Sequence, residues 1–355
     1  RHAEIRNEKE HDHMMDAMLL ERVVRLDECN QPLVMRRVAM PEPGPGELLL
    51  RVLACGVCHT EIDEIEGRTP PSFFPIIPGH QVVGRVERFG SGVEGIEAGS
   101  RRGVAWINSA CGQCPFCLDG FENLCDGFRA TGRDADGGYA GFMVAKAAFT
   151  YPIPDLFTDA EAAPLLCGGA IGYRSLMLAR LKNGETLGLT GFGASAHQVL
   201  KLARFLYPSS SVFVFARNAA DREFALSLGA DWAGDTTSDP PEPCASIIDT
   251  TPAWRPVLAA LERLRPGGRL VINAIRKEAG DSGLLSGICY ERQLWMEKEV
   301  KSVANITRAD VSAFLDIAGR MKLKPEVVCY PLRDANRALL DIRYGRSRGA
   351  VVLIP

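Results

Sequence analysis

The sequence has little excess charge and no long hydrophobic run. Its 355 residues carry a formal net charge of −3, so no basic field would attract DNA, RNA or an anionic membrane surface. The longest apolar stretches, such as residues 186–190 and 351–354, are far shorter than the roughly 20 residues that a transmembrane helix needs. We therefore expect no nucleic-acid partner, no membrane and a small molecule as the ligand.

A secretory signal is also lacking. The first residues are rich in charge, with Glu8, Lys9 and Glu10 in succession, and they contain no apolar segment of the kind that such a signal requires. This composition predicts a mobile extension over residues 1–17.

The cysteines do not form a disulfide pattern. Eleven cysteines in a chain of this length are too few and too unevenly spaced for a disulfide framework, and four of them lie between Cys111 and Cys125. Clustering of that kind favours metal binding in a reducing compartment, so the cytoplasm is the expected location.

The pattern of the chain changes near residue 160. Before that point, short alternating runs broken by glycine and proline indicate a β-rich domain that begins at Met18. After it, strands alternate with helices: strands are expected at 186–190, 212–216, 245–249 and 269–274, and helices at 194–206, 219–228 and 254–264. This alternation predicts an α/β fold with a doubly wound parallel (Rossmann) sheet. A helix near 308–320 and strands at 326–330 and 350–354 are expected to return to the first domain.

A glycine turn follows the first strand of the second half. Gly191, Gly193 and Ala196 occupy the three positions of a Gly-x-Gly-x-x-Gly/Ala motif, between an expected strand and an expected helix. This is the context in which such a turn binds a pyrophosphate at a helix N-terminus. His197 is expected to pack on the sheet as a helix residue rather than to act in catalysis.

The end of the second strand indicates which dinucleotide binds. An acidic residue about 20 residues after the glycines would hydrogen-bond the ribose of NAD. Here Ala216 and Arg217 stand at this position, and arginine can pair with the 2′-phosphate of NADP. We therefore favour NADP over NAD, although a surface arginine after a strand is also compatible with NAD.

Four cysteines in one short segment form the strongest metal motif. Tetrahedral zinc takes four thiolates, and Cys-x-x-Cys turns supply sulfurs in pairs. Because protein would fill every coordination position, such a zinc would stabilise its lobe and take no part in chemistry. The alternatives are a pair of disulfides or unpaired loop cysteines. The residues concerned are Cys111, Cys114, Cys117 and Cys125.

Three further positions carry a weaker signal. Cys58 stands in Cys58-His59-Thr60, His80 follows Pro78-Gly79, and Cys167 precedes Gly168-Gly169. Each alone reads more readily as a packed cysteine or a satisfied histidine. In this order, and together with the four-cysteine lobe, they make the chain resemble the zinc-dependent medium-chain alcohol dehydrogenase family from about Met18 to the C-terminus.

The resemblance implies a domain plan and two zinc ions per chain. Residues 18–165 would form a GroES-like catalytic domain, with the structural zinc lobe at about 108–128. Residues 166–300 would form the Rossmann domain, and 301–355 would return to the catalytic domain. Cys58, His80 and Cys167 would bind the catalytic zinc, whereas Cys55 would be a packed strand residue.

Roles for further residues also follow from the resemblance. Thr60 would accept the proton of the alcohol, and Asp63 stands where much of the family ends this relay with a histidine. Since a carboxylate has an ordinary pKa of about 4, it is a poorer base than histidine. His59 would contact the cofactor pyrophosphate, and Trp106 either narrows the substrate pocket or belongs to the core. Gln81 replaces a glutamate that approaches the zinc in the family, so ligand exchange would differ.

The expected function is hydride transfer between NAD(P) and a primary alcohol or aldehyde, with a dimer or tetramer as the assembly. Two alternatives stay open at this point. One is a zinc-free quinone or enoyl reductase on the same fold, and the other is a non-catalytic sensor that binds zinc and nucleotide.

Overall fold

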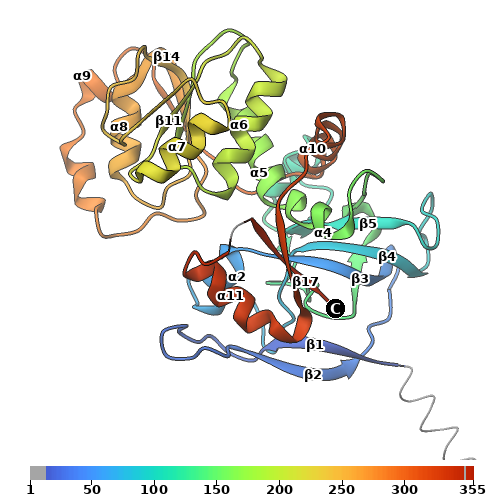
Figure 1. Ribbon diagram of the computed structural model, residues 1–355. Coiled ribbons are helices and arrows are strands. Elements are labelled where there is room, and N and C mark those ends of the chain that lie inside the picture. Colours follow the sequence, from blue (N-terminus) through green and yellow to red (C-terminus); the bar gives the residue numbers. More distant parts are fainter. Residues whose placement is uncertain (1–12, 348) are drawn as a thin grey trace, which may run out of the picture. The chain divides into compact units, whose positions relative to one another are not determined.

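The computed structural model describes residues 13–347 and 349–355, and it divides them into two compact units (Figure 1). Unit 1 runs to Cys167 and resumes at Ile306, and unit 2 consists of residues 168–305. The sequence placed these boundaries after residues 165 and 300. The chain thus leaves unit 1 once and returns to it once.

Unit 1 is built around a seven-stranded, largely antiparallel sheet. Its strands follow the order β16-β17-β3-β4-β5-β9, and β8 pairs with β3. The sheet strands are β3 (Glu47–Val57), β4 (Gln81–Phe89), β5 (Arg101–Val104), β8 (Phe142–Lys146), β9 (Thr150–Pro152), β16 (Val327–Pro331) and β17 (Ala350–Ile354). The last two come from the C-terminal segment, so the end of the chain completes the sheet begun by β3.

Short elements surround this sheet. A small ribbon of β6 (Ile107–Ser109) and β7 (Arg129–Ala130) flanks the four-cysteine segment. The helices are α2 (His59–Ile65), α3 (Pro115–Leu118), α4 (Asp159–Ala162), α10 (Arg308–Met321) and α11 (Ala335–Arg343), with 3₁₀ turns η1 (Glu122–Leu124), η2 (Ala147–Phe149), η3 (Ala163–Leu166) and η5 (Leu332–Asp334).

The start of unit 1 differs from the sequence prediction. Strand β1 (Met14–Leu20) pairs antiparallel with β2 (Leu33–Ala39), so the prediction of a mobile extension was wrong for residues 14–17. The physical reason is burial: Met15 and Ala17 are buried, and Ala17 also bridges to Ala140. Residues 1–12, the rest of the predicted extension, lie outside the described residues.

Unit 2 contains a six-stranded sheet in the order β12-β11-β10-β13-β14-β15, and all neighbouring strands run parallel. This confirms the predicted doubly wound sheet. Its strands are β10 (Leu187–Thr190), β11 (Val212–Phe215), β12 (Trp232–Gly234), β13 (Cys244–Asp249), β14 (Leu264–Ile272) and β15 (Glu299–Ser302), and its helices are α5 (Gly168–Ala179), α6 (Ala194–Leu206), α7 (Ala219–Ser227), α8 (Arg255–Arg263) and α9 (Tyr290–Gln293), with the turn η4 (Ser282–Gly287).

Strand β14 begins earlier than the sequence indicated. The sequence predicted a strand at 269–274, but the strand starts at Leu264 and passes through Gly267 and Gly268. The register shifts there: Leu264 pairs with Cys244, whereas Arg269 pairs with Ser246. The glycines therefore form a bulge within the strand, with Gly267 at a φ of 67°.

Among the described residues, the consecutive helical elements α4, η3 and α5 over Asp159–Ala179 are together long and apolar enough to cross a membrane by length and composition alone. Of its most apolar window, 61% is buried inside the structure. Such burial is typical of a core helix in a globular protein.

Candidate active site

Three sequence-distant residues of unit 1 meet at one point. Cys58 caps the N-terminus of α2, His80 directly precedes β4, and Cys167 follows η3. His80 Nε2 lies 3.2 Å from Cys167 Sγ and 3.7 Å from Cys58 Sγ. The ligand atoms of this set all lie within 4.8 Å of one another, so one metal ion could bind all three.

Close packing around Gly79 places His80. Gly79 has a φ of 98°, and a Cβ at this residue would lie 2.3 Å from the Tyr139 ring and 2.8 Å from Cys55 Sγ. Only glycine fits both the conformation and the space. Cys55 itself is fully buried in β3, where the sequence expected a packed strand residue.

Glu61 connects two of the three ligands, and sequence reasoning missed it. Glu61 Oε2 accepts a hydrogen bond from the Cys58 backbone N–H at 2.8 Å, and Glu61 Oε1 lies 2.6 Å from His80 Nδ1. Both side chains are essentially inaccessible. A carboxylate beside Nδ1 keeps the ring proton there and leaves Nε2 free to face the sulfurs. The signal was the capping-box spacing from Cys58 to Glu61.

The donor set fits zinc. Two sulfurs and one imidazole nitrogen are the ligand types that zinc prefers, and three protein ligands leave one tetrahedral position for a substrate. Contact with Cys167, together with burial and the Glu61 carboxylate, raises the pKa of the Cys58 thiol well above its usual range. A cation is therefore needed to hold the Cys58 sulfur as a thiolate, as a bound metal does.

The four clustered cysteines form a second group whose sulfurs lie within 4.8 Å of one another. Backbone N–H groups point at these sulfurs: Cys114 N–H donates to Cys111 Sγ at 3.3 Å, and Gly127 N–H donates to Cys125 Sγ at 3.2 Å. Backbone donors from Gln113 and Cys114 lower the pKa of the Cys111 thiol to about 6. Amide donors to sulfur stabilise thiolates, so the segment fits a zinc with four thiolate ligands.

The residues after Cys58 lie on α2. His59 is its first residue and is exposed, and the N–H of buried Thr60 donates to Cys58 Sγ at 3.3 Å. The backbone of Thr60 is thus fixed beside the sulfur of Cys58.

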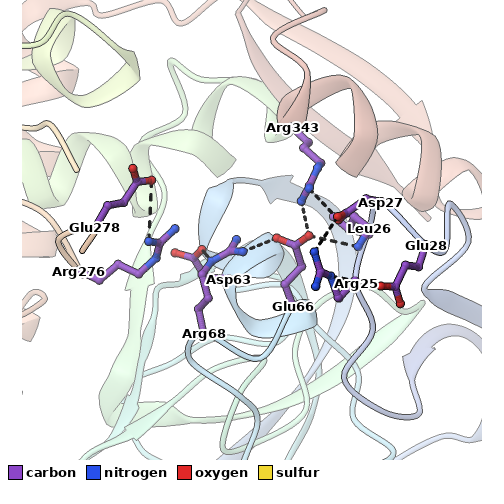
Figure 2. A network of polar contacts seen from close by, with 10 residues as sticks. All are labelled: Arg25, Leu26, Asp27, Glu28, Asp63, Glu66, Arg68, Arg276, Glu278 and Arg343. Carbon is purple, nitrogen blue, oxygen red and sulfur yellow. Dashed lines mark hydrogen bonds and ion pairs between the residues drawn. The ribbon is translucent and has the colours of Figure 1, made fainter. Parts of the chain in front are cut away.

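Asp63, on the same helix, belongs to a network of charged side chains (Figure 2). Asp63 accepts a hydrogen bond from Arg68, which also donates to Glu66 at the end of α2. Glu66 in turn accepts from Arg343 of α11 and from the N–H of Leu26, the latter at 3.1 Å. The position where much of the family has a histidine therefore holds a carboxylate paired with a guanidinium.

Trp106 lies between aromatic, cationic and acidic neighbours. Its ring centroid is 5.6 Å from that of Phe128, and the guanidinium of Arg133 lies 5.3 Å from the same ring. Glu64 of α2 is the acidic neighbour of the indole, whose buried N–H makes no hydrogen bond to the described residues. Burial, and then repulsion by Glu61, raise the pKa of Glu64 to about 8, so this buried acid is largely protonated at neutral pH.

Gln81 is buried against Gly56 of the neighbouring strand β3, a residue that has no side chain. A Cβ on Gly56 of β3 would lie 2.6 Å from Gln81 Oε1. Gly56 and Gln81 pair directly between β3 and β4. The amide therefore packs across Gly56, and it cannot supply the charge of the glutamate it replaces.

The glycine turn of unit 2 has the expected setting. Gly191 has a φ of 78°, and Gly193 caps α6 without a side-chain hydrogen bond, with nothing within 4 Å of the place where a Cβ would stand. The backbone at Gly193 is thus open to a phosphate. Ala196 is fully buried, and the half-buried His197 packs edge-on against Phe224.

The end of β11 lies next to this turn, because Thr190 and Phe215 are paired in the sheet. Ala216 is buried, and Arg217 is exposed. Arg222 donates to the carbonyl oxygens of Ala216 (2.7 Å) and Arg217 (2.8 Å). Two arginines therefore gather where the cofactor ribose is expected.

Comparison with known proteins identifies the family. The family description "Alcohol dehydrogenase GroES-like domain" matches residues 44–155. "Probable alcohol dehydrogenase AdhA" of Mycobacterium tuberculosis is 42% identical over 328 residues, which cover 91% of this chain and 93% of that protein. The chain belongs to the zinc-dependent medium-chain alcohol dehydrogenase family.

Solved structures agree with this assignment. A thermostable alcohol dehydrogenase from Pyrobaculum aerophilum matches with a TM-score of 0.84 and 26% identity, covering 97% of this chain and all of that one. A protein of Sinorhizobium meliloti 1021, solved with NADP bound, matches with a TM-score of 0.82 and 25% identity over 96% of this chain and 99% of that one. The alcohol dehydrogenase is thus an oxidoreductase with a GroES-like domain and a doubly wound sheet, as predicted, and it acts on small alcohols or aldehydes. The two alternatives from the sequence, a non-catalytic sensor and a zinc-free quinone or enoyl reductase, do not receive such support from these comparisons.

Proposed function

We propose that this alcohol dehydrogenase works at a zinc ion held by Cys58, His80 and Cys167, and that it interconverts unhindered primary alcohols and aldehydes. A zinc ion there would polarise the substrate oxygen. The observation that carries the proposal is the ligand set around buried His80, with Glu61 hydrogen-bonded to the backbone of Cys58 and beside the His80 ring. Turnover of an aromatic aldehyde by zinc-replete protein is the direct test, and complete inactivity would contradict it.

The side chains of α2 would handle the proton. We propose that Thr60, fixed beside Cys58 Sγ, accepts the proton of the alcohol, and that Asp63 ends the relay as the partner of Arg68. His59 would contact the cofactor pyrophosphate. Trp106, held by Phe128 and Arg133, would narrow the pocket and favour short or flat substrates.

A second zinc would be structural. The four sulfurs of Cys111, Cys114, Cys117 and Cys125 would complete its coordination and leave no position for a substrate. Two zinc ions per chain are therefore expected by metal analysis.

We propose NADP as the preferred cofactor, bound by Gly191, Gly193 and Ala196 with its 2′-phosphate near Ala216 and Arg217. The absence of an acid at Ala216 and the nearness of Arg222 support this, since guanidinium groups pair with phosphate in bidentate fashion. We expect kcat/KM for NADPH to exceed that for NADH by about tenfold or more, equivalent to ~1.4 kcal/mol.

The variant Arg217→Asp tests this preference. It should use NADH better than NADPH, with an unchanged KM for the aldehyde. Equal use of both cofactors by the wild type would contradict the preference without touching the zinc chemistry. A preference for NADPH would favour aldehyde reduction as the direction of the reaction in the cell. The eleven free cysteines fit the reducing cytoplasm as the location.

We also propose that the enzyme forms a homo-oligomer through the edge of the unit 2 sheet. All four residues of edge strand β15 are exposed, and Trp295 and Met296 just before it are both more than half exposed. In the described sheet β15 pairs with β14 on one side only, and a free strand edge beside exposed apolar groups is a template for a second copy. We expect a dimer or tetramer by light scattering, and smaller species for Val300→Lys. A monomeric wild type would overturn this.

A further inference from the structure

An ion pair is buried at the carboxyl edge of the unit 2 sheet. Asp249, the last residue of β13, is fully buried, and the side chain of Lys277, from the loop after β14, is only 9% exposed. The Lys277 ammonium donates to Asp249 and also to the backbone oxygens of Thr251 (2.7 Å) and Ala253 (3.1 Å). An ammonium has three hydrogens, so this lysine is fully used in holding one segment of backbone.

Asp249 holds the same segment from the other side. Its Oδ1 accepts a hydrogen bond from Thr251 Oγ1 at 2.8 Å. Both the N–H and the hydroxyl of Thr250 donate to the carbonyl oxygen of Thr190, the last residue of β10, at 2.9 and 3.1 Å. Residues 250–253 are therefore fixed both to the ion pair and to the strand that leads into the glycine turn.

This segment touches the glycine turn directly. A Cβ placed on Gly191 would lie 2.9 Å from Thr251 Cγ2 and 3.0 Å from Thr250 Oγ1. Residues 250–253 thus pack directly against the backbone at Gly191, the first glycine of the motif. Any movement of this segment would change where Gly191, and the backbone amides that follow it, can lie.

Stability alone does not explain such a pair. Moving two charges out of water costs several kcal/mol per ion, and apolar residues of similar volume are often as stable or more so. The geometry offers a different explanation, because both charged side chains hydrogen-bond the segment 250–253, which packs against the proposed dinucleotide site. We propose that Asp249 and Lys277 are positioning residues that set the pyrophosphate-binding turn through residues 250–253. This inference rests on the proposed role of that turn.

The test measures NADPH binding by fluorescence, together with cofactor KM, kcat and thermal stability. Lys277→Met should weaken NADPH binding about tenfold, because misplaced amides bind phosphate poorly, while kcat at saturating cofactor changes by less than about twofold. The preference between NADPH and NADH should stay unchanged, because Arg217 lies at another strand. Lys277→Arg should restore binding.

Two further variants keep the outcome interpretable. The double variant Lys277→Met, Asp249→Leu leaves neither charge of this pair in the interior. It therefore tests the positioning role even if Lys277→Met does not fold, and it should also bind NADPH weakly. Glu299→Gln is the matched control: it breaks the ion pair with Arg269, a side chain also 9% exposed in the same sheet, and should bind NADPH as the wild type does.

The variant Gly193→Val distinguishes failure of this inference from failure of the proposed dinucleotide site on which it rests. If this variant binds NADPH normally, the proposed dinucleotide site is wrong. If Gly193→Val loses binding while Lys277→Met or the double variant binds with wild-type affinity, the site stands and the positioning role is overturned. Equal weakening in Glu299→Gln would also overturn it, because the effect would then be general destabilisation.

Discussion

The variant His80→Ala should lose alcohol and aldehyde turnover by at least about 1000-fold in kcat/KM, equivalent to ~4 kcal/mol of transition-state stabilisation. Removing the imidazole leaves two thiols beside the buried Glu61 carboxylate, whose Oε1 no longer faces a ring nitrogen. We therefore expect the metal content to fall from two zinc ions per chain to one.

Glu61→Gln gives a graded version of this experiment. Outer partners of metal-binding histidines change metal affinity by about 10- to 100-fold, so zinc should dissociate more readily at a given chelator concentration. His197→Gln is the control, since this histidine lies on α6 of unit 2 beside Phe224. Full turnover by a His80→Ala protein that contains one zinc would show that the catalytic centre lies elsewhere.

The second large effect is expected in the four-cysteine lobe. Its helix α3 buries no residue, and the apolar side chains Phe116 and Leu118 are 47% and 74% exposed. The segment thus has little hydrophobic core, and the zinc–thiolate bonds would replace one. Cys114→Ser should cost about 3 kcal/mol or more and lower Tm by roughly 6–12 °C, while kcat of the protein that stays folded is unchanged.

Calorimetry with zinc analysis checks this prediction. Cys329→Ser is the control, because that cysteine is exposed on β16 and is not in either ligand group. His80→Ala and Cys114→Ser should thus have opposite profiles, one losing activity and the other losing stability. A Tm equal to that of Cys329→Ser would contradict a structural zinc.

Local patterns gave reliable predictions for regular elements. Helix α6 and strand β17 have the expected bounds, because a glycine turn and a continuous apolar run mark them without reference to the rest of the chain. Two groups of side chains that could hold a metal ion match the predicted sets. The four-cysteine set was indicated by its Cys-x-x-Cys spacing, whereas Cys58, His80 and Cys167 were predicted through the resemblance to the family.

Features set by distant partners were not predictable. The capping-box spacing marks Glu61 only as a residue at the start of a helix, and only the fold shows that it is buried against His80, which directly precedes β4. Met15 and Ala17 looked like part of a charged extension because β2, which pairs with them, follows after a long interruption. Likewise, nothing local to Lys277 shows that its partner stands 28 residues earlier, at Asp249.

The placement of unit 2 within the chain has a consequence for synthesis. All seven proposed zinc ligands, ending with Cys167, precede the first residue of unit 2, so a ribosome delivers both proposed ligand sets before any of unit 2 exists. Strand β17, however, pairs with β3 at Cys55, three residues before Cys58, and it follows all of unit 2 in the chain. During translation a zinc ion would therefore meet its proposed ligands early, whereas the sheet that carries Cys58 gains β17 only after unit 2 has been made.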